Sequence, residues 1–218
     1  MSSLLSRLFS EADFAHIADA VKRAEAGTSG EIVPYVVETS DDYEESIWRG
    51  GFVGAMLTLA PFAFMRSVSD LWLFNPWTVL GIALGASGLV MALLWVSPRS
   101  RVMLTGADKR RRRVATRARE AFLSEEVFKT RERTGILILV SLMEHEVVVL
   151  GDSGINAKVN PPQWEEIVAT VVRGMRMGKP ADGLVQAIEK CGTLLSNAGI
   201  ARRSDDRDEL PDALRTGV

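Results

Sequence analysis

Two stretches of the chain carry no charged residue, and they constrain its folding more than any other feature. The stretches are Gly51–Met65 and Leu71–Ser97. A helix needs about 20 mostly apolar residues to cross the roughly 30 Å hydrocarbon core of a membrane. In the second stretch, Asn75 followed by Pro76 is typical of a helix start, and the chain from Pro76 to Ser97 gives about 33 Å of helix. We therefore predict a transmembrane helix there.

The first stretch is shorter and needs its flanking residues to span the core. It is long enough if residues 47–68 are counted together and if Arg49 and Arg66 extend toward the two interfaces. Pro61 predicts a kink, which membrane helices tolerate. The two stretches together predict a transmembrane hairpin over residues 47–97.

The tryptophans support a membrane hairpin over two buried helices of a soluble protein. Trp48 and Trp95 fall near one rim of the predicted hairpin, and Trp72 and Trp77 fall near the other. Only Trp164 lies elsewhere in the chain. Tryptophan at both rims is typical of the aromatic belts of membrane proteins.

The basic residues predict how the hairpin is oriented. The link Arg66–Leu71 holds one arginine, whereas the opposite side holds Arg49, Arg99, Arg101 and the run Lys109–Arg113. Because lysine and arginine near span ends stay in the cytoplasm, we expect both long flanks to be cytoplasmic. The prediction is an inner (cytoplasmic) membrane protein with two spans and with both termini in the cytoplasm.

The composition excludes several other classes of protein. Hydrophobic residues make up 47% and charged residues 25%, the balance of a folded chain rather than a disordered one. The formal net charge of −2 hides a basic segment, Arg99–Arg119, with nine cations and one anion. A single cysteine, Cys191, excludes an intrachain disulfide.

Outside the hairpin the chain alternates helical and strand patterns, which predicts an α/β domain. Three segments read as strands: Ile32–Val37, Ile136–Leu142 and Glu146–Leu150. The first two are joined by a crossover, so we expect them to be parallel, with the third antiparallel at the edge. One helix is expected to begin after Ser10, and three others are expected over Asp108–Phe122, Pro161–Met177 and Ala181–Asn197.

The predicted fold is a small mixed sheet sandwiched by helices and interrupted by the two-helix transmembrane hairpin. The domain is expected in two parts, residues 10–46 and 98–200, and the hairpin of residues 47–97 is inserted between them. The second part begins with the basic helix. Residues 201–218 have mixed charge and predict a disordered, solvated tail.

Three segments resemble the TPM domain family in its membrane-anchored bacterial form. They are TSGEIV at Thr28–Val33, RTGILI at Arg133–Ile138 and VVVLGDSGI at Val147–Ile155. The resemblance implies an α/β sandwich with a small mixed sheet. It also implies divalent cation binding and acid phosphatase activity, as in some members, or a role in assembly or regulation of membrane complexes, as in others. Many members carry the domain in a lumen or outside the cell, whereas the arginines here predict a cytoplasmic domain.

The acidic residues offer two candidate cation sites, for Ca²⁺ or Mg²⁺. Asp152 lies between glycines in a loop, and Glu31 is a possible second carboxylate, since hard cations bind several oxygen ligands. The alternative for Asp152 is an Asx turn that serves only the backbone. Asp41 and Asp42 form the other candidate site, because ligands often bind beyond the carboxyl ends of parallel strands; the same run also suits a helix start.

The basic run and the missing motifs complete the sequence-based expectations. Lys109, Arg110, Arg111, Arg112 and Arg113 follow a membrane span closely, so we expect contact with anionic lipids rather than nucleic acid. The alternative is an exposed helix whose cations pair with acidic residues of the domain. The chain has no glycine-rich phosphate loop or dinucleotide fingerprint, so no nucleotide cofactor is expected.

Three functions remain open from the sequence. The first is a non-enzymatic accessory or interaction module on the cytoplasmic membrane face, acting with other membrane proteins, with or without a bound divalent cation. The second is a metal-dependent phosphatase, for which no catalytic residues can be assigned. The third is an oligomeric membrane scaffold, because Gly81, Gly85 and Gly88 permit close packing of helices, including those of a second copy.

Overall fold

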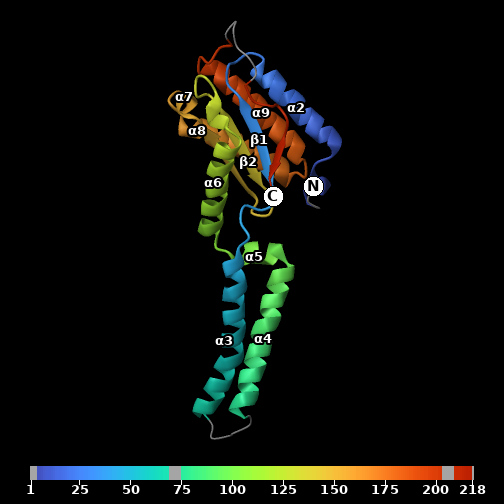
Figure 1. The fold of residues 1–218 in the computed structure, drawn as a ribbon, viewed down its shortest axis with the longest axis vertical. Helices are drawn as coiled ribbons and strands as arrows, with labels where there is room; N and C mark the ends of the chain where they lie inside the picture. Colours follow the sequence, from blue (N-terminus) through green and yellow to red (C-terminus); the bar gives the residue numbers. More distant parts are fainter. Residues whose placement is uncertain (1–3, 69–74, 203–208, 218) are drawn as a thin grey trace. The chain divides into compact units, whose positions relative to one another are not determined.

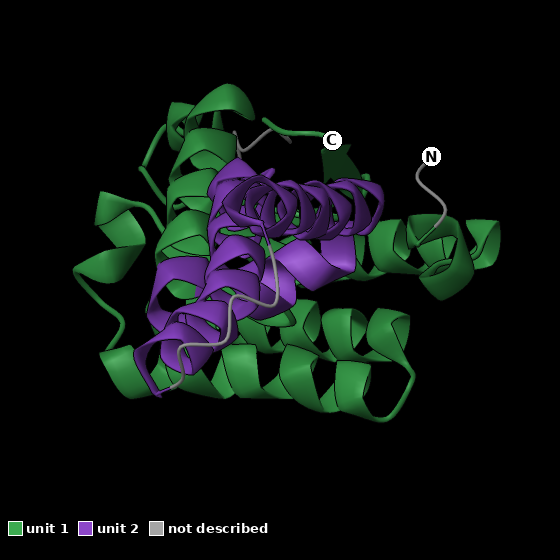
Figure 2. Ribbon diagram, turned by 90° about the horizontal axis from the view of Figure 1, so that it is seen from below, with its two compact units in different colours: residues 1–41, 111–218 green, residues 42–110 purple. Residues whose placement is uncertain are grey.

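The computed structural model describes residues 4–68, 75–202 and 209–217 of the chain (Figure 1). It separates into two compact units, residues 1–41 with 111–218 and residues 42–110 (Figure 2). The second unit is inserted into the first, and its residues 42–110 include the segment 47–97 in which the hairpin is predicted. Trp72 and the last part of the predicted link lie outside the described residues.

The first unit contains a mixed four-stranded sheet in the order β3-β2-β1-β4. The strands are β1 (Ile32–Val37), β2 (Ile136–Ser141), β3 (Glu146–Gly151) and β4 (Arg215–Gly217). β1 and β2 are parallel, with Ile32 opposite Ile136, and β3 runs antiparallel to β2 with Gly151 opposite Ile136. The predicted fold class and strand directions are confirmed.

The fourth strand lies within the predicted tail, of which residues 215–217 form a strand. β4 pairs in parallel with β1, placing Tyr35 opposite Arg215. Leu214 is buried in the core beside it, and the Arg215 guanidinium lies 2.8 Å from a carboxylate oxygen of Glu125. Backbone pairing and these two side chains hold the segment, although its composition is polar.

Helices cover both faces of the sheet, because alternate strand residues point to opposite sides. Ile32, Val36, Ile136 and Ile138 belong to one core cluster with residues of three helices. These helices are α2 (Glu11–Glu25), α8 (Pro161–Arg176) and α9 (Pro180–Asn197). On the other face, Val33, Tyr35 and Leu137 pack with α6 (Ala107–Ser124), whose start belongs to the second unit. Short elements complete this unit: α1 (Leu5–Leu8), the 3₁₀ helix η1 (Val127–Lys129) and α7 (Ser153–Asn156).

Local signals in the sequence explain where several helices begin. Ser10 and Asp13 form the capping box that starts α2. Asn160 and Gln163 form another at the start of α8. In the second unit, the Asn75 side chain accepts a hydrogen bond from the Trp77 backbone, and Pro76 occupies the first position of α4 (Pro76–Val96).

The second unit is built on two long apolar helices, α3 (Glu44–Val68) and α4, which lie side by side, followed by α5 (Pro98–Leu104) (Figure 1). α3 stays helical through Pro61. Its glycines allow the close approach, since a Cβ at Gly51 would lie 2.7 Å from the Met91 side chain and one at Gly54 would lie 3.1 Å from Val90. Both helices are long and apolar enough to cross a membrane.

Candidate functional site

The predicted cation ligand Asp152 lies at the end of the edge strand β3, where its side chain has internal partners. One carboxylate oxygen accepts hydrogen bonds from the backbone N–H of Ser153 at 2.6 Å and from its hydroxyl at 3.2 Å, which caps α7. The other lies 3.0 Å from Nε of Arg133. These contacts match the turn-like alternative for Asp152, because one oxygen caps α7 and the other pairs with the Arg133 guanidinium.

The segments RTGILI and TSGEIV, two of the three that resemble the family, meet beside Asp152. The backbone N–H of Asp152 donates to the Gly135 carbonyl at 2.9 Å, and that of Ile136 donates to the Glu31 carbonyl at 2.8 Å. The Thr134 hydroxyl donates to the Ser29 carbonyl at 3.1 Å. The segments that carry the family resemblance therefore form one hydrogen-bonded network at this end of the sheet.

Glu31, the second predicted ligand, directly precedes β1 at the same end of the sheet, but its side chain has a different neighbour. Its buried carboxylate accepts the backbone N–H of Glu209 at 3.2 Å. Two strand spacings of about 4.8 Å separate its backbone from that of Asp152. A cavity of about 170 Å³ lies beside it, with the lining residues Lys22, Glu25, Ala26, Thr28, Glu31, Arg202 and Asp212.

The second predicted site, Asp41 and Asp42, is divided between the two units. The Asp41 carboxylate lies 2.8 Å from Nη1 of Arg113. Asp42 has an exposed side chain, and its backbone carbonyl accepts a 2.8 Å hydrogen bond from Arg101. Among the residues that the structure describes, no three His, Cys, Asp or Glu side chains are grouped so that they could hold a metal ion. The cation sites stay predictions.

A buried glutamate in the turn between β2 and β3 is not among the site residues predicted from the sequence. Glu144, in the turn between β2 and β3, accepts hydrogen bonds from the Ser40 backbone at 2.9 Å and from the Ser141 hydroxyl at 2.6 Å. The Thr39 hydroxyl is a third donor at 3.1 Å. No local signal distinguishes Glu144 from an exposed turn residue, because its donors are mostly about a hundred positions away.

Most cations of the predicted lipid-binding run have partners within the protein. Lys109 pairs with Glu45, Arg111 lies 3.4 Å from Glu146, and Arg113 pairs with Asp41. Arg110 donates to the carbonyls of Val102 and Thr105 at 3.4 and 3.1 Å, so it caps the end of α5. The structure thus brings these four side chains to neighbouring groups, as the alternative expectation of internal pairing described.

Cys191 is fully buried in α9, and burial raises the pKa of its thiol from 9.0 to about 12. The folded thiol therefore keeps its proton while the unfolded thiol loses it above about pH 9. Its contribution to stability is complete below pH 9 and is lost as the pH rises toward 12.

We expect Cys191 to resist alkylation in the folded protein at pH 7. Its burial blocks access, and only the thiolate reacts readily. Mass spectrometry after N-ethylmaleimide treatment should show no adduct in the folded chain and full modification in guanidinium chloride. Equal labelling of both states would contradict the burial.

Comparison with known proteins agrees with this architecture. The family model described as "TPM domain" matches residues 101–194. The NMR structure of the BA42 protein from the psychrophilic bacterium Bizionia argentinensis is similar over 100% of both chains, with 22% identity and a TM-score of 0.59. No curated protein matches the chain.

These findings define the class as a mixed α/β domain carrying an inserted pair of apolar helices. Residues 101–194 match the model of the TPM domain family, and the whole chain shares the fold of the BA42 protein.

Proposed function

We propose that the chain is a membrane-anchored accessory protein, in which α3 and α4 span the bilayer and the TPM domain is an interaction module on the cytoplasmic face. The supporting observation is the exposure of the two helices. Only 11% of the most apolar segment of each helix is buried. A core helix of a soluble protein is mostly buried, whereas lipid-facing side chains are left open by the protein itself.

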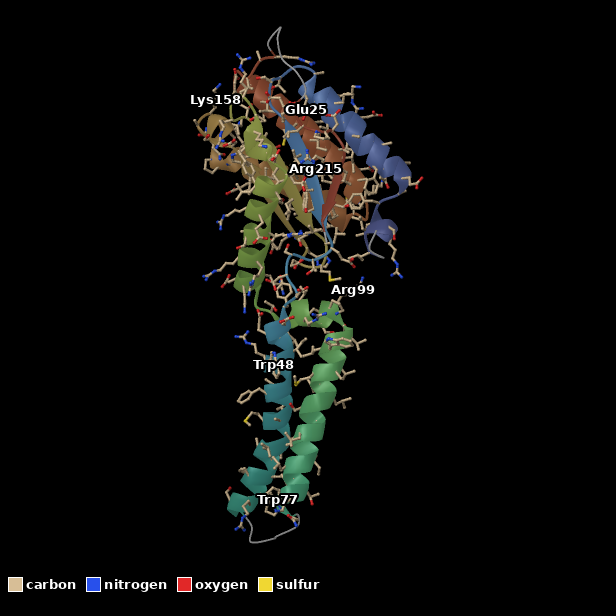
Figure 3. The ribbon with its side chains drawn as sticks, in the orientation of Figure 1. Glu25, Trp48, Trp77, Arg99, Lys158 and Arg215 are labelled. Carbon is tan, nitrogen blue, oxygen red and sulfur yellow. The ribbon has the colours of Figure 1, made fainter. Side chains whose placement is uncertain are left out.

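The tryptophans and the charges support the same proposal. Trp48 and Trp77 are exposed near opposite ends of the helix pair (Figure 3). Arg66 is the cation near the end of α3 that leads into the link, whereas Arg49 and Arg99 lie near the opposite end of the pair. This distribution favours a cytoplasmic position for the end that bears Trp48.

Single-cysteine labelling should test insertion and orientation together. Buried Cys191 gives a silent background, so Ser67→Cys and Asp108→Cys each add one exposed thiol. In spheroplasts, we expect a membrane-impermeant maleimide to label Ser67→Cys fully and Asp108→Cys by less than about a tenth, because only the link faces outward. Lysis should expose both sites. Equal labelling before lysis would contradict the topology, and recovery of the chain in the soluble fraction would contradict anchoring.

A metal-dependent phosphatase is the second candidate, supported by the cavity beside Glu31, which has both acidic and basic lining residues. In this version a Ca²⁺ or Mg²⁺ ion held at Asp152 or at Glu31, whose backbones lie two strand spacings apart, would polarise a phosphoryl group. The neighbouring cations Lys22 and Arg202 would suit the charge of a phosphate.

Calorimetric titration of the full chain with Ca²⁺ or Mg²⁺ should distinguish the candidate sites. Asp152→Asn is the informative variant, because an amide oxygen can still cap α7 while the charge is lost. If Asp152 is a ligand, we expect at least a tenfold weaker affinity in Asp152→Asn and no change in Asp41→Asn. The reverse pattern would move the site to Asp41. No saturable heat at millimolar cation would reject both sites and leave the interaction module.

A further inference from the structure

The second unit has an exposed surface near Trp48 whose residues take no part in the ion pairs of the basic run. It combines three kinds of group: the arginines Arg49 and Arg99, the tryptophans Trp48 and Trp95, and the apolar residues Met103 and Leu104 of α5. We call these six residues the collar. All belong to residues 42–110, so their arrangement lies within one compact unit.

The arginines of the collar differ from those of the basic run. Arg49 and Arg99 are exposed, and neither makes an ion pair with an acidic residue of the described chain. Arg101, two residues after Arg99, instead donates to the Asp42 carbonyl. Two guanidinium groups are therefore available to an anion from outside the protein.

The apolar side chains of α5 have no protein cover either. Val102 is buried against the unit, but Met103 is 80% exposed and Leu104 is 59% exposed. Arg99 and Met103 are four residues apart and therefore share a face of the helix. A cation beside exposed apolar groups is the pattern of a helix that lies in a membrane interface.

The position of α5 in the chain matches an interfacial role. It begins directly after Ser97, at the end of the apolar helix α4, and Figure 3 places Arg99 at the end of the pair away from Trp77. Arg110 caps its last carbonyls, and the Ser46 hydroxyl lies 3.0 Å from that of Thr105. These contacts fix α5 against α3, so its exposed face is held in place.

We propose that the collar binds anionic phospholipid at the cytoplasmic interface, with α5 lying in the headgroup region. Arg49 and Arg99 contact the lipid phosphates, and Met103 and Leu104 enter the upper acyl region. This inference rests on the proposed membrane anchoring. It replaces Lys109–Arg113 as the main lipid contact, since four of those cations have internal partners.

The first test measures lipid preference at the tryptophans of the full chain. The protein is reconstituted into vesicles of phosphatidylcholine containing brominated phosphatidylglycerol or brominated phosphatidylcholine, which quench nearby tryptophan fluorescence. We expect phosphatidylglycerol to be preferred. Arg49→Gln and Arg99→Gln should each lower that preference about fivefold, the ratio expected for one cation near a charged surface.

Arg112→Gln is the matched control, because Arg112 is exposed and lies in the basic run. It should keep the wild-type preference. Loss of preference in Arg112→Gln but not in the collar variants would overturn the proposal, as would a wild-type chain with no preference. Failure of the chain to incorporate into vesicles would instead reject the membrane anchoring itself.

The second test follows the apolar part of the collar. Leu104→Cys and Leu123→Cys place a thiol at leucines of similar exposure, 59% and 63%, on α5 and on α6. With an environment-sensitive dye, the label at position 104 should be quenched by lipids that carry a spin label near the headgroup. The label at position 123 should not be quenched. Equal quenching at the two positions would overturn the interfacial placement of α5.

Discussion

Gly174→Ala should lower the free energy of unfolding of the first unit by about 3 kcal/mol, the upper end of the usual cost of overpacking. Gly174 in α8 faces Gly183 in α9, and the two helices meet there through their backbones. A Cβ at Gly174 would overlap the Cα of Gly183 and would lie 2.8 Å from its backbone nitrogen. Since no flexible side chain is involved, the helices themselves must separate.

Two physical effects predict opposite signs for the change in stability of Gly174→Ala. Alanine is a better helix former than glycine by about 1 kcal/mol, so helix propensity alone predicts that Gly174→Ala stabilises α8. Steric overlap predicts the opposite. Val171 and Ile188 of the same two helices are buried in the core, so a separation would also expose apolar surface.

Hydrogen exchange of peptides from α8 and α9, together with thermal unfolding, should measure the effect. Gly27→Ala is the matched control, because its added Cβ has no atom within 4 Å, and we expect it to change stability by less than about 0.5 kcal/mol. Unchanged or slower exchange in Gly174→Ala would show that the crossing relaxes without loss of packing.

Much of the fold was predictable because its signals are local. The Ser10 capping box and the Asn75–Pro76 start lie within a few residues of the helices they begin. Strand Ile136–Ser141 is a continuous apolar run, and its parallel pairing with β1 follows from the crossover between them. The two long apolar helices α3 and α4 were predictable for the same reason, since the absence of charge over a long segment can be read without knowledge of other parts of the chain.

The remainder depended on contacts between distant segments. β4 has three residues and a polar composition, and its place is set by backbone pairing with β1 and by the distant Glu125. The partners of the basic run could not be predicted for the same reason, because Asp41 and Glu146 come close to it only in the folded chain. Gly174 likewise carried no signal, since its role depends on where α9 crosses α8.

Candidate site residues were harder to predict, because a carboxylate that serves the backbone looks the same in sequence as one that binds a ligand. Asp152 is an example, with its cap and its contact with Arg133 supplied by the fold. Glu144 is the stronger case. It is buried, and neither its position in a short turn nor its neighbours in sequence indicate that.

Glu144→Ala should lower the free energy of unfolding by about 3 kcal/mol. The substitution removes the acceptor for Ser40, Thr39 and the fully buried Ser141. Leaving a buried donor without a partner costs about 1–3 kcal/mol, and the cost is larger when the lost partner was charged. The Ser40 backbone should also exchange its amide proton faster, because Glu144 is its acceptor.

Glu146→Ala is the matched control, two residues away on the same hairpin. Its carboxylate lies 3.4 Å from the exposed Arg111, and surface ion pairs of this kind contribute about 0–1 kcal/mol. Thermal unfolding of the two variants should therefore differ clearly, with Glu144→Gln between them because its amide retains one acceptor oxygen.

Repeating the unfolding measurements with Ca²⁺ and with a chelator distinguishes a structural role of Glu144 from a role in cation binding. If Glu144 only connects the residues that follow β1 to the β2–β3 turn through hydrogen bonds, Glu144→Ala should lower the free energy of unfolding equally in both conditions. A loss confined to the Ca²⁺ condition would contradict this role, because it would mean that the carboxylate acts through a bound cation. The donors around Glu144 favour the first outcome, since both of its oxygens already accept hydrogen bonds from the protein.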